Sequence, residues 1–117
     1  MPPTTNFEFG DLVLVDFLFT SLAGTKRRPA VVVSSRQYNQ RRLDVILMPV
    51  TSKLRSPLPF GETLLADWQK AGLLAPSAVK PIPLTFEKTL VLRTLGRLET
   101  ADRHALETTL RSILSAT

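Results

Sequence analysis

The sequence predicts a mainly β protein, a small barrel or strongly curled antiparallel sheet with one short helix and one packed C-terminal helix. Three short segments rich in β-forming residues occur within the first half of the chain, and the segments between them are too short for a helical crossover. The end of the chain instead repeats apolar residues at helical spacing. At 117 residues, with 44% apolar and 21% charged residues, the chain has the size and composition of one globular domain.

The three predicted strands cover residues 12–17, 30–35 and 43–51. The first alternates imperfectly between apolar and polar residues, and the second is a nearly unbroken apolar run that is typical of a buried strand. Pro49 suggests that the third strand lies at an edge or contains a bulge. A polar, glycine-containing loop over residues 20–28 and a polar turn over residues 37–42 are expected between them.

The second half of the chain predicts shorter elements. A proline-containing loop over residues 52–59 is followed by one or two helical turns over residues 63–71, ended by Gly72. Further short strands are expected at residues 77–80 and 90–92. Thr100 is the predicted N-cap of a helix that reaches about Leu114. One face of this helix carries Leu106, Leu110, Ile113 and Leu114, and the other carries Arg103, Glu107 and Arg111.

The charge of the chain is basic and unevenly distributed. The net charge is +5, and residues 1–60 hold eight Lys and Arg residues against four Asp and Glu residues. A basic excess favours a polyanionic partner such as nucleic acid, or an acidic protein partner. A solvated surface that happens to be basic explains the same composition equally well.

Several classes of site are excluded by composition. Without cysteine the chain forms neither disulfides nor cysteine-based zinc sites, and a single histidine excludes His-rich metal sites. We therefore expect no metal ion and no other cofactor. The N-terminus lacks the features of a signal peptide, and no apolar run approaches the roughly 20 residues that span a bilayer. We expect a cytoplasmic protein without a membrane partner.

Two polar segments flank the predicted buried strands. Lys26, Arg27 and Arg28 precede the second strand, and arginine in particular matches the geometry of phosphate oxygens. Thr51 ends the third strand, where a hydroxyl can donate to a phosphate. Each segment alone also fits an ordinary solvated strand end. Since adjacent antiparallel strands run in opposite directions, Arg28 and Thr51 should lie at the same end of the sheet.

Other residues with chemical potential have simpler explanations. His104 lies near the polar face of the predicted C-terminal helix and is expected at the surface. Trp68 could stack on a base, but a single tryptophan in a short amphipathic segment usually anchors packing. Asp11, Asp16 and Asp44 lie in or beside strands and show no recognisable paired spacing.

Four segments, in order, carry a family resemblance: residues 10–17 (Gly-Asp-Leu-Val-Leu-Val-Asp-Phe), 28–34 (Arg-Pro-Ala-Val-Val-Val-Ser), 49–52 (Pro-Val-Thr-Ser) and 95–98 (Leu-Gly-Arg-Leu). With them the chain resembles the MazF/PemK toxins of type II toxin–antitoxin systems. The resemblance implies one toxin domain over residues 1–117, with its core at about 9–114, folded as an SH3-like barrel of the MazF/PemK/CcdB kind. It also implies a homodimer that cleaves single-stranded mRNA as an endoribonuclease and is silenced by an acidic antitoxin.

The resemblance assigns roles to individual residues. The catalytic arginine of the family falls on Arg28 and its catalytic threonine on Thr51, the pair that topology places together. Five further residues are expected to contact RNA: Lys26, Arg27, Ser52, Lys53 and Lys80. Many family members carry a carboxylate and a glutamine where this chain has Ile82 and Pro83, so the resemblance does not supply a general base.

The expected chemistry uses the 2′-hydroxyl of RNA as the nucleophile, which leaves the protein to stabilise charge and to manage two protons. Two other functions fit a basic barrel of this size: an RNA-binding module without catalysis, and a gyrase poison of the CcdB type. The second of these ends in a tryptophan-bearing tail, whereas this chain ends Ile-Leu-Ser-Ala-Thr.

Overall fold

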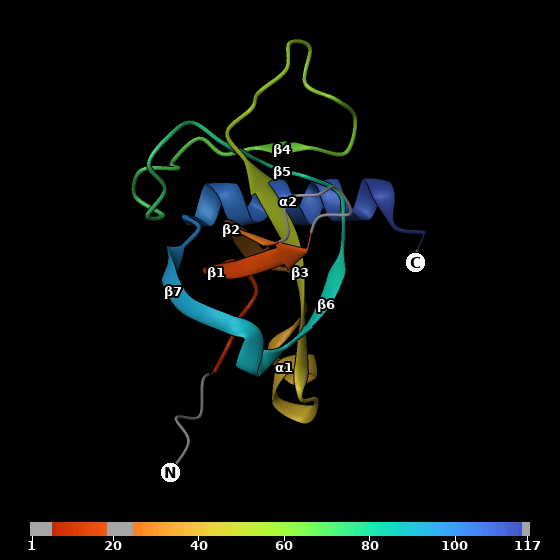
Figure 1. Cartoon of the computed structure of the whole chain (residues 1–117). Coiled ribbons are helices and arrows are strands. Elements are labelled where there is room, and N and C mark those ends of the chain that lie inside the picture. The colour runs from red at the N-terminus through yellow and green to blue at the C-terminus, as the bar shows by residue number, and fades with distance from the viewer. Residues whose placement is uncertain (1–5, 19–24, 116–117) are drawn as a thin grey trace.

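The computed structural model describes residues 6–18 and 25–115 of the chain (Figure 1). Its elements, in order, are β1 (Asp11–Leu18), β2 (Thr25–Val32), α1 (Arg36–Arg41), β3 (Asp44–Thr51), β4 (Thr63–Leu64), β5 (Ala78–Val79), β6 (Leu84–Glu87), a 3-10 turn (Lys88–Leu90), β7 (Val91–Arg97) and α2 (Thr100–Ile113). The prediction of a mainly antiparallel β fold with one short helix and a C-terminal helix is confirmed, although the short helix lies elsewhere than expected.

All strand pairs in the sheet are antiparallel, and the strand order is β4-β5-β3-β2-β1-β7. The first half of β3 pairs with β6 and its last two residues pair with β5, while β2 lies along its other side. The interpretation of Pro49 as a sign of an edge strand is therefore wrong. Pro49 lies where β3 exchanges one neighbour for the other, a point at which its missing N–H breaks no ladder.

The sheet separates two apolar clusters. Alternate residues of β1 to β3 point to opposite faces, because successive side chains of a strand alternate. One cluster, which includes Val13, Val15 and Phe17, also gathers Phe86 from β6 and Val91 from β7, so the sheet curls around it. The other cluster lies between the sheet and α2 and buries Leu98 and Leu106 completely.

The C-terminal helix is tied to the sheet by a buried carboxylate. Asp102 is 2% exposed, and its two oxygens accept hydrogen bonds from the backbone N–H groups of Ala66 and Asp67, each at 2.8 Å. The helix begins one residue earlier than predicted, because Glu99 and not Thr100 is the N-cap. Leu114, expected on the buried face, follows the helix and is 52% exposed.

Several other predictions are corrected by the structure. β2 begins at Thr25, so Lys26 to Arg28 lie in a strand instead of a loop, and the rest of the predicted loop lies outside the described residues. The polar turn is the helix α1, capped by the Ser35 hydroxyl. Residues 66–72 form turns and not a helix, and the chain reverses at Gly72, whose φ is +104°. β6 is an additional strand that was not predicted.

Figure 1 shows α1 at one end of β3 and an arch formed by the segment between β3 and β4 at the other end. No helix in the described part of the chain is long and apolar enough to cross a membrane. The arch end of the sheet is where the predicted site residues lie.

Candidate RNA-cleavage site

Arg28 and Thr51 come from neighbouring strands and line one cleft. β2 and β3 pair with Ala30 opposite Pro49, and continuing this register by two residues brings Arg28 level with Thr51. Both residues therefore lie at the end of the β2–β3 ladder, where the two strands stop pairing. The placement of this pair depends on the register of β2 against β3. A shift of one residue between the two strands would turn one of the two side chains to the other face of the sheet.

The cleft has a volume of about 280 Å³. It is lined by Phe17, Arg28, Pro49, Val50, Thr51, Ser52, Lys53, Lys80, Ile82 and Leu84. We call it the Arg28–Thr51 cleft. Three of its residues are cationic and none is acidic, so it is suited to a phosphate with its negative charge. Three of the five residues predicted to bind RNA thus share the cleft with the two predicted catalytic residues.

The Thr51 hydroxyl is fixed by the backbone. Its Oγ1 accepts a hydrogen bond from the Lys53 N–H at 3.1 Å, and the residue is half-buried. A hydroxyl that accepts in this way still has its own O–H to donate. The bond therefore orients Thr51 while leaving a donor for a substrate oxygen.

Lys80 is placed by β5. Its backbone N–H donates to the Pro49 carbonyl at 2.8 Å, which holds the segment after β5 against the end of β3. Ile82 follows on the same wall and is 42% exposed. The wall that faces Arg28 thus combines one cation with exposed apolar side chains.

The three basic residues of β2, Lys26, Arg27 and Arg28, have different surroundings. Arg28 is exposed and forms no ion pair or hydrogen bond with any described side chain. Lys26 is on the same face, level with Phe17, but does not line the cleft. Arg27 points to the opposite face, where its Nε lies 3.6 Å from Asp16 Oδ1. The sequence run therefore contains one cleft residue and two neighbours outside it.

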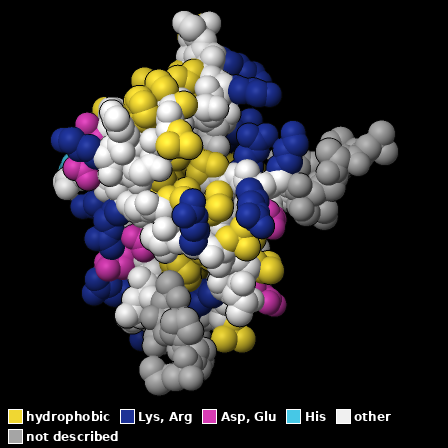
Figure 2. Space-filling view, turned by 60° about the vertical axis from the view of Figure 1, so that its left-hand side comes forward, with side chains coloured by type: hydrophobic (Ala, Val, Ile, Leu, Met, Phe, Trp, Pro, Cys, Tyr) yellow, Lys and Arg dark blue, Asp and Glu magenta, His cyan; other side chains and the backbone are white. Residues whose placement is uncertain are grey.

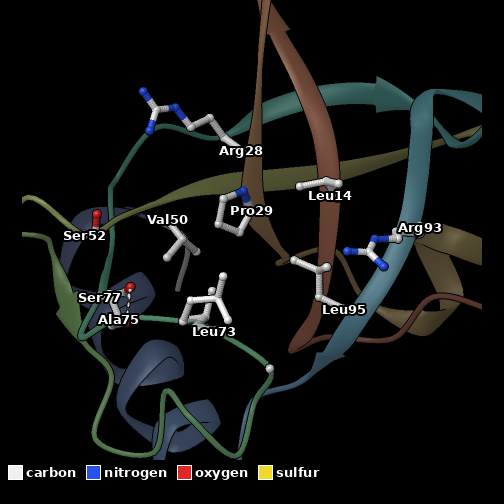
Figure 3. A pocket seen from close by; sticks show the side chains of 12 residues that line it. Leu14, Arg28, Pro29, Val50, Ser52, Leu73, Ala75, Ser77, Arg93 and Leu95 are labelled. Carbon is white, nitrogen blue, oxygen red and sulfur yellow. Dashed lines mark hydrogen bonds between the residues drawn. The ribbon is translucent and has the colours of Figure 1, made fainter.

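A second cleft of about 330 Å³ shares Arg28, Val50 and Ser52 with the first and was not predicted (Figure 3). Its walls are mostly apolar and include Leu14, Pro29, Val50, Leu73 and Leu95. In Figure 3 the Arg28 guanidinium extends away from this apolar floor, whereas the Arg93 side chain of β7 points toward it from the opposite side. The sequence around Arg93 does not indicate that it lines a cleft with Arg28, because only the pairing of β1 with β7 brings the two residues to the same cleft.

The acidic residues near the sheet are neutralised by arginines. Asp11, Asp16 and Asp44 form ion pairs with Arg97, Arg27 and Arg42, at 3.0, 3.6 and 3.1 Å. Within the described ranges, no three His, Asp or Glu side chains are grouped so that they could hold a metal ion. The side chain of His104 is 83% exposed, and Trp68 packs against the apolar cluster under α2. These residues therefore lie outside the Arg28–Thr51 cleft.

The family model for the PemK-like, MazF-like toxin of type II toxin–antitoxin systems matches residues 8–114. The chain belongs to this toxin family. The match covers all ten cleft residues, and it confirms the family resemblance predicted from the four sequence segments. No curated protein sequence matches the chain.

Solved structures show the same fold as this MazF-like toxin. A structure of MazE–MazF from Deinococcus radiodurans superposes with a TM-score of 0.74 at 23% identity, covering 97% of this chain and 100% of that one. An endoribonuclease in complex with its cognate antitoxin from a Mycobacterial species has a TM-score of 0.69 at 20% identity, with 93% of each chain covered. The Deinococcus radiodurans MazF alone has a TM-score of 0.69 at 22% identity, covering 96% of this chain and 99% of that chain.

Proposed function

We propose that this MazF-like toxin is an endoribonuclease that cuts single-stranded mRNA at specific short sequences, without a metal ion. The observation that carries the proposal is the Arg28–Thr51 cleft, where a phosphate-binding guanidinium and an oriented hydroxyl line the same cationic cleft. Membership of a family whose solved relatives include an endoribonuclease supports the same reaction.

The reaction is an internal transesterification. The 2′-hydroxyl attacks the adjacent phosphorus, the bond from phosphorus to the 5′-oxygen breaks, and the products are a 2′,3′-cyclic phosphate and a 5′-hydroxyl. Arg28 stabilises the negative charge that builds up on the non-bridging oxygens, since arginine is always charged and its fork matches two oxygens. Thr51 donates its O–H to the same phosphate and positions it for in-line attack.

The remaining predicted contacts hold the RNA backbone. Ser52, Lys53 and Lys80 lie in the cleft and hold the scissile phosphate, and Lys26, on the same face beyond the cleft, contacts a neighbouring phosphate. Arg27 pairs with Asp16 on the opposite face, so we assign it no RNA contact. No carboxylate lines the cleft, and the family resemblance implies that Ile82 stands where many members carry one. The proton of the 2′-hydroxyl passes to water, the leaving 5′-oxygen takes up a proton from water, and we assign no side chain as general base or general acid.

End-group analysis tests this proposal. One labelled single-stranded RNA that the protein cuts is incubated with and without excess EDTA, and both fragments are weighed by mass spectrometry. We expect equal cleavage in both conditions, a 2′,3′-cyclic phosphate or 3′-phosphate on one fragment, and a 5′-hydroxyl on the other. A 5′-phosphate, or loss of cleavage in EDTA, would show a metal-dependent nuclease, and no cleavage at all would favour an RNA-binding module.

We also propose that the protein is a cytoplasmic homodimer inhibited by an acidic, partly disordered antitoxin. Three of the similar structures contain an antitoxin, and the basic charge of this chain suits an acidic partner. Apolar side chains gather between Lys and Arg side chains on one face (Figure 2), and Leu74 beside the second cleft is 99% exposed. Such a surface favours protein association. Sedimentation that shows only monomer at tens of micromolar would contradict the dimer.

A further inference from the structure

The segment between β3 and β4 begins at the Arg28–Thr51 cleft, which Ser52 and Lys53 line. It follows β3 after Thr51, forms the arch at one end of the molecule, and leads into β4 at Thr63 (Figure 1). A Cβ placed on Gly61 would lie 3.2 Å from Pro81 Cγ, so the returning arm packs against Pro81. The two neighbours of Pro81, Lys80 and Ile82, line the cleft. The arch is therefore joined to the cleft at Lys53, and its returning arm packs beside the wall formed by Lys80 and Ile82.

A tight turn presents Phe60 on the returning arm. The Glu62 N–H donates to the Pro59 carbonyl at 3.2 Å, and Gly61 has a φ of +93°, as the third residue of a type II turn requires. Phe60 is the second residue of this turn, and 82% of its surface is exposed. Proline before it and the close contact after it fix the turn. The aromatic ring is thus held in solvent by a preorganised backbone and takes no part in the core.

The arch carries a net positive charge. It contains Lys53 and Arg55, both exposed, and one carboxylate, the half-buried Glu62 that ends the turn. Exposed aromatic rings combined with cations along a groove are typical of surfaces that bind single-stranded nucleic acid, where bases stack on the rings and phosphates meet the cations. The charge of the arch and its continuity with the cleft both favour RNA as its ligand.

We propose that Phe60 stacks on one unpaired base of the substrate RNA, at a position flanking the scissile phosphate. Lys53 and Arg55 neutralise the phosphates between this base and the cleft. The inference rests on the proposed function and adds a base-binding residue to it, because an aromatic ring can stack on any unpaired base. Phe60 takes part in positioning the RNA and not in the chemical step.

Fluorescence and binding measurements test the stacking directly. Two probes are used. One is a pool of single-stranded RNA with 2′-O-methyl groups at every position, which the protein cannot cut. The other, called the pool without bases, is the abasic sugar–phosphate chain of the same length. In Phe60→Trp we expect RNA to quench the introduced indole beyond the change seen in wild type, whose Trp68 gives the baseline. The pool without bases should give no such quenching.

A second variant measures the contribution to binding. Phe60→Leu keeps an apolar side chain but removes the ring, and we expect it to weaken Kd for the pool by about five- to a hundredfold. The matched control is Leu43→Ala, which changes an apolar residue of similar exposure, 88%, at the start of β3 and should leave Kd within about twofold.

The outcomes separate this inference from the proposed function. Equal Kd values for wild type and Phe60→Leu, or equal quenching by the pool without bases, would overturn the stacking. Phe60→Leu could instead alter only the sedimentation of the protein or its inhibition by an antitoxin, with Kd for RNA unchanged. That result would also overturn the stacking, in favour of a protein contact. Cleavage by wild type is measured separately. If RNA stacks on residue 60 but wild type does not cleave it, only the proposed function is contradicted. If wild type cleaves RNA but Phe60→Leu leaves Kd unchanged, only the stacking is contradicted.

Discussion

Arg28→Ala removes the one guanidinium that lines the Arg28–Thr51 cleft. Losing a preorganised donor that stabilises developing charge raises an activation barrier by about 2.7–4 kcal/mol, so we expect cleavage to slow by about 10²–10³-fold. The folded state should be almost unaffected, because Arg28 is exposed and is paired with no described side chain. The free energy of unfolding should change by no more than about 0.5 kcal/mol.

The matched control is Arg41→Ala, which removes the same charge from the exposed end of α1. Arg41 precedes β3, and Thr51 is the last residue of that strand. The seven steps from Asp44 to Thr51 cover about 23 Å at about 3.3 Å per residue, so Arg41 lies far from the cleft. Both variants lower the net charge equally, so a general electrostatic effect on RNA association would slow both. Initial rates on one labelled RNA, with urea unfolding of each variant, check the expectation. Arg28→Ala that keeps more than a tenth of the wild-type rate would refute the assignment.

Three further predictions address the hydroxyl, the anchor of α2 and the acid sensitivity of the fold. Thr51→Val should slow cleavage by about 10-fold or more, whereas Thr51→Ser keeps the hydroxyl and should restore most of the rate; equal rates with an intact circular dichroism spectrum would contradict the role of the hydroxyl. Asp102→Asn should lower the free energy of unfolding by about 1.5–3 kcal/mol in urea, because the buried carboxylate accepts two part-buried backbone N–H groups and Asn keeps only one of the two oxygens, and a loss below about 1 kcal/mol would be inconsistent with that anchor. The pKa of Glu8 is lowered by hydrogen bonds from Arg36 and then Arg97, so its stabilising effect is present near neutral pH and is lost as pH falls below its ordinary value. Wild type should therefore exceed Glu8→Gln in stability at pH 7 by more than at pH 3, as acid titrations of urea unfolding can measure.

The strands that form the cleft could be predicted from the sequence because they carry local signals. β1 to β3 are rich in β-forming residues, and short connections require them to pair antiparallel. The direction of the strands then places Arg28 near Thr51 without any structural information. This part of the site depends only on strand order and register.

The elements that were missed depend on distant contacts. α1 has no apolar periodicity, and its only buried residue, Asn39, is held by the carbonyl groups of Phe7 and Ser34. β6 is mostly exposed and exists as a strand through its pairing with β3. The second cleft requires close backbone contact between Gly96 and Ala71, which only a residue without a side chain permits. None of these contacts leaves a local pattern in the sequence.

The central claim is that the substrate supplies its own nucleophile in the Arg28–Thr51 cleft. It is tested most directly by replacing the 2′-hydroxyl by hydrogen at the single nucleotide before the cut, in an RNA that wild type cleaves. We predict that cleavage at that site stops while Kd changes by less than about threefold, because phosphate contacts dominate affinity. Continued cleavage of the deoxy-substituted site would contradict the account.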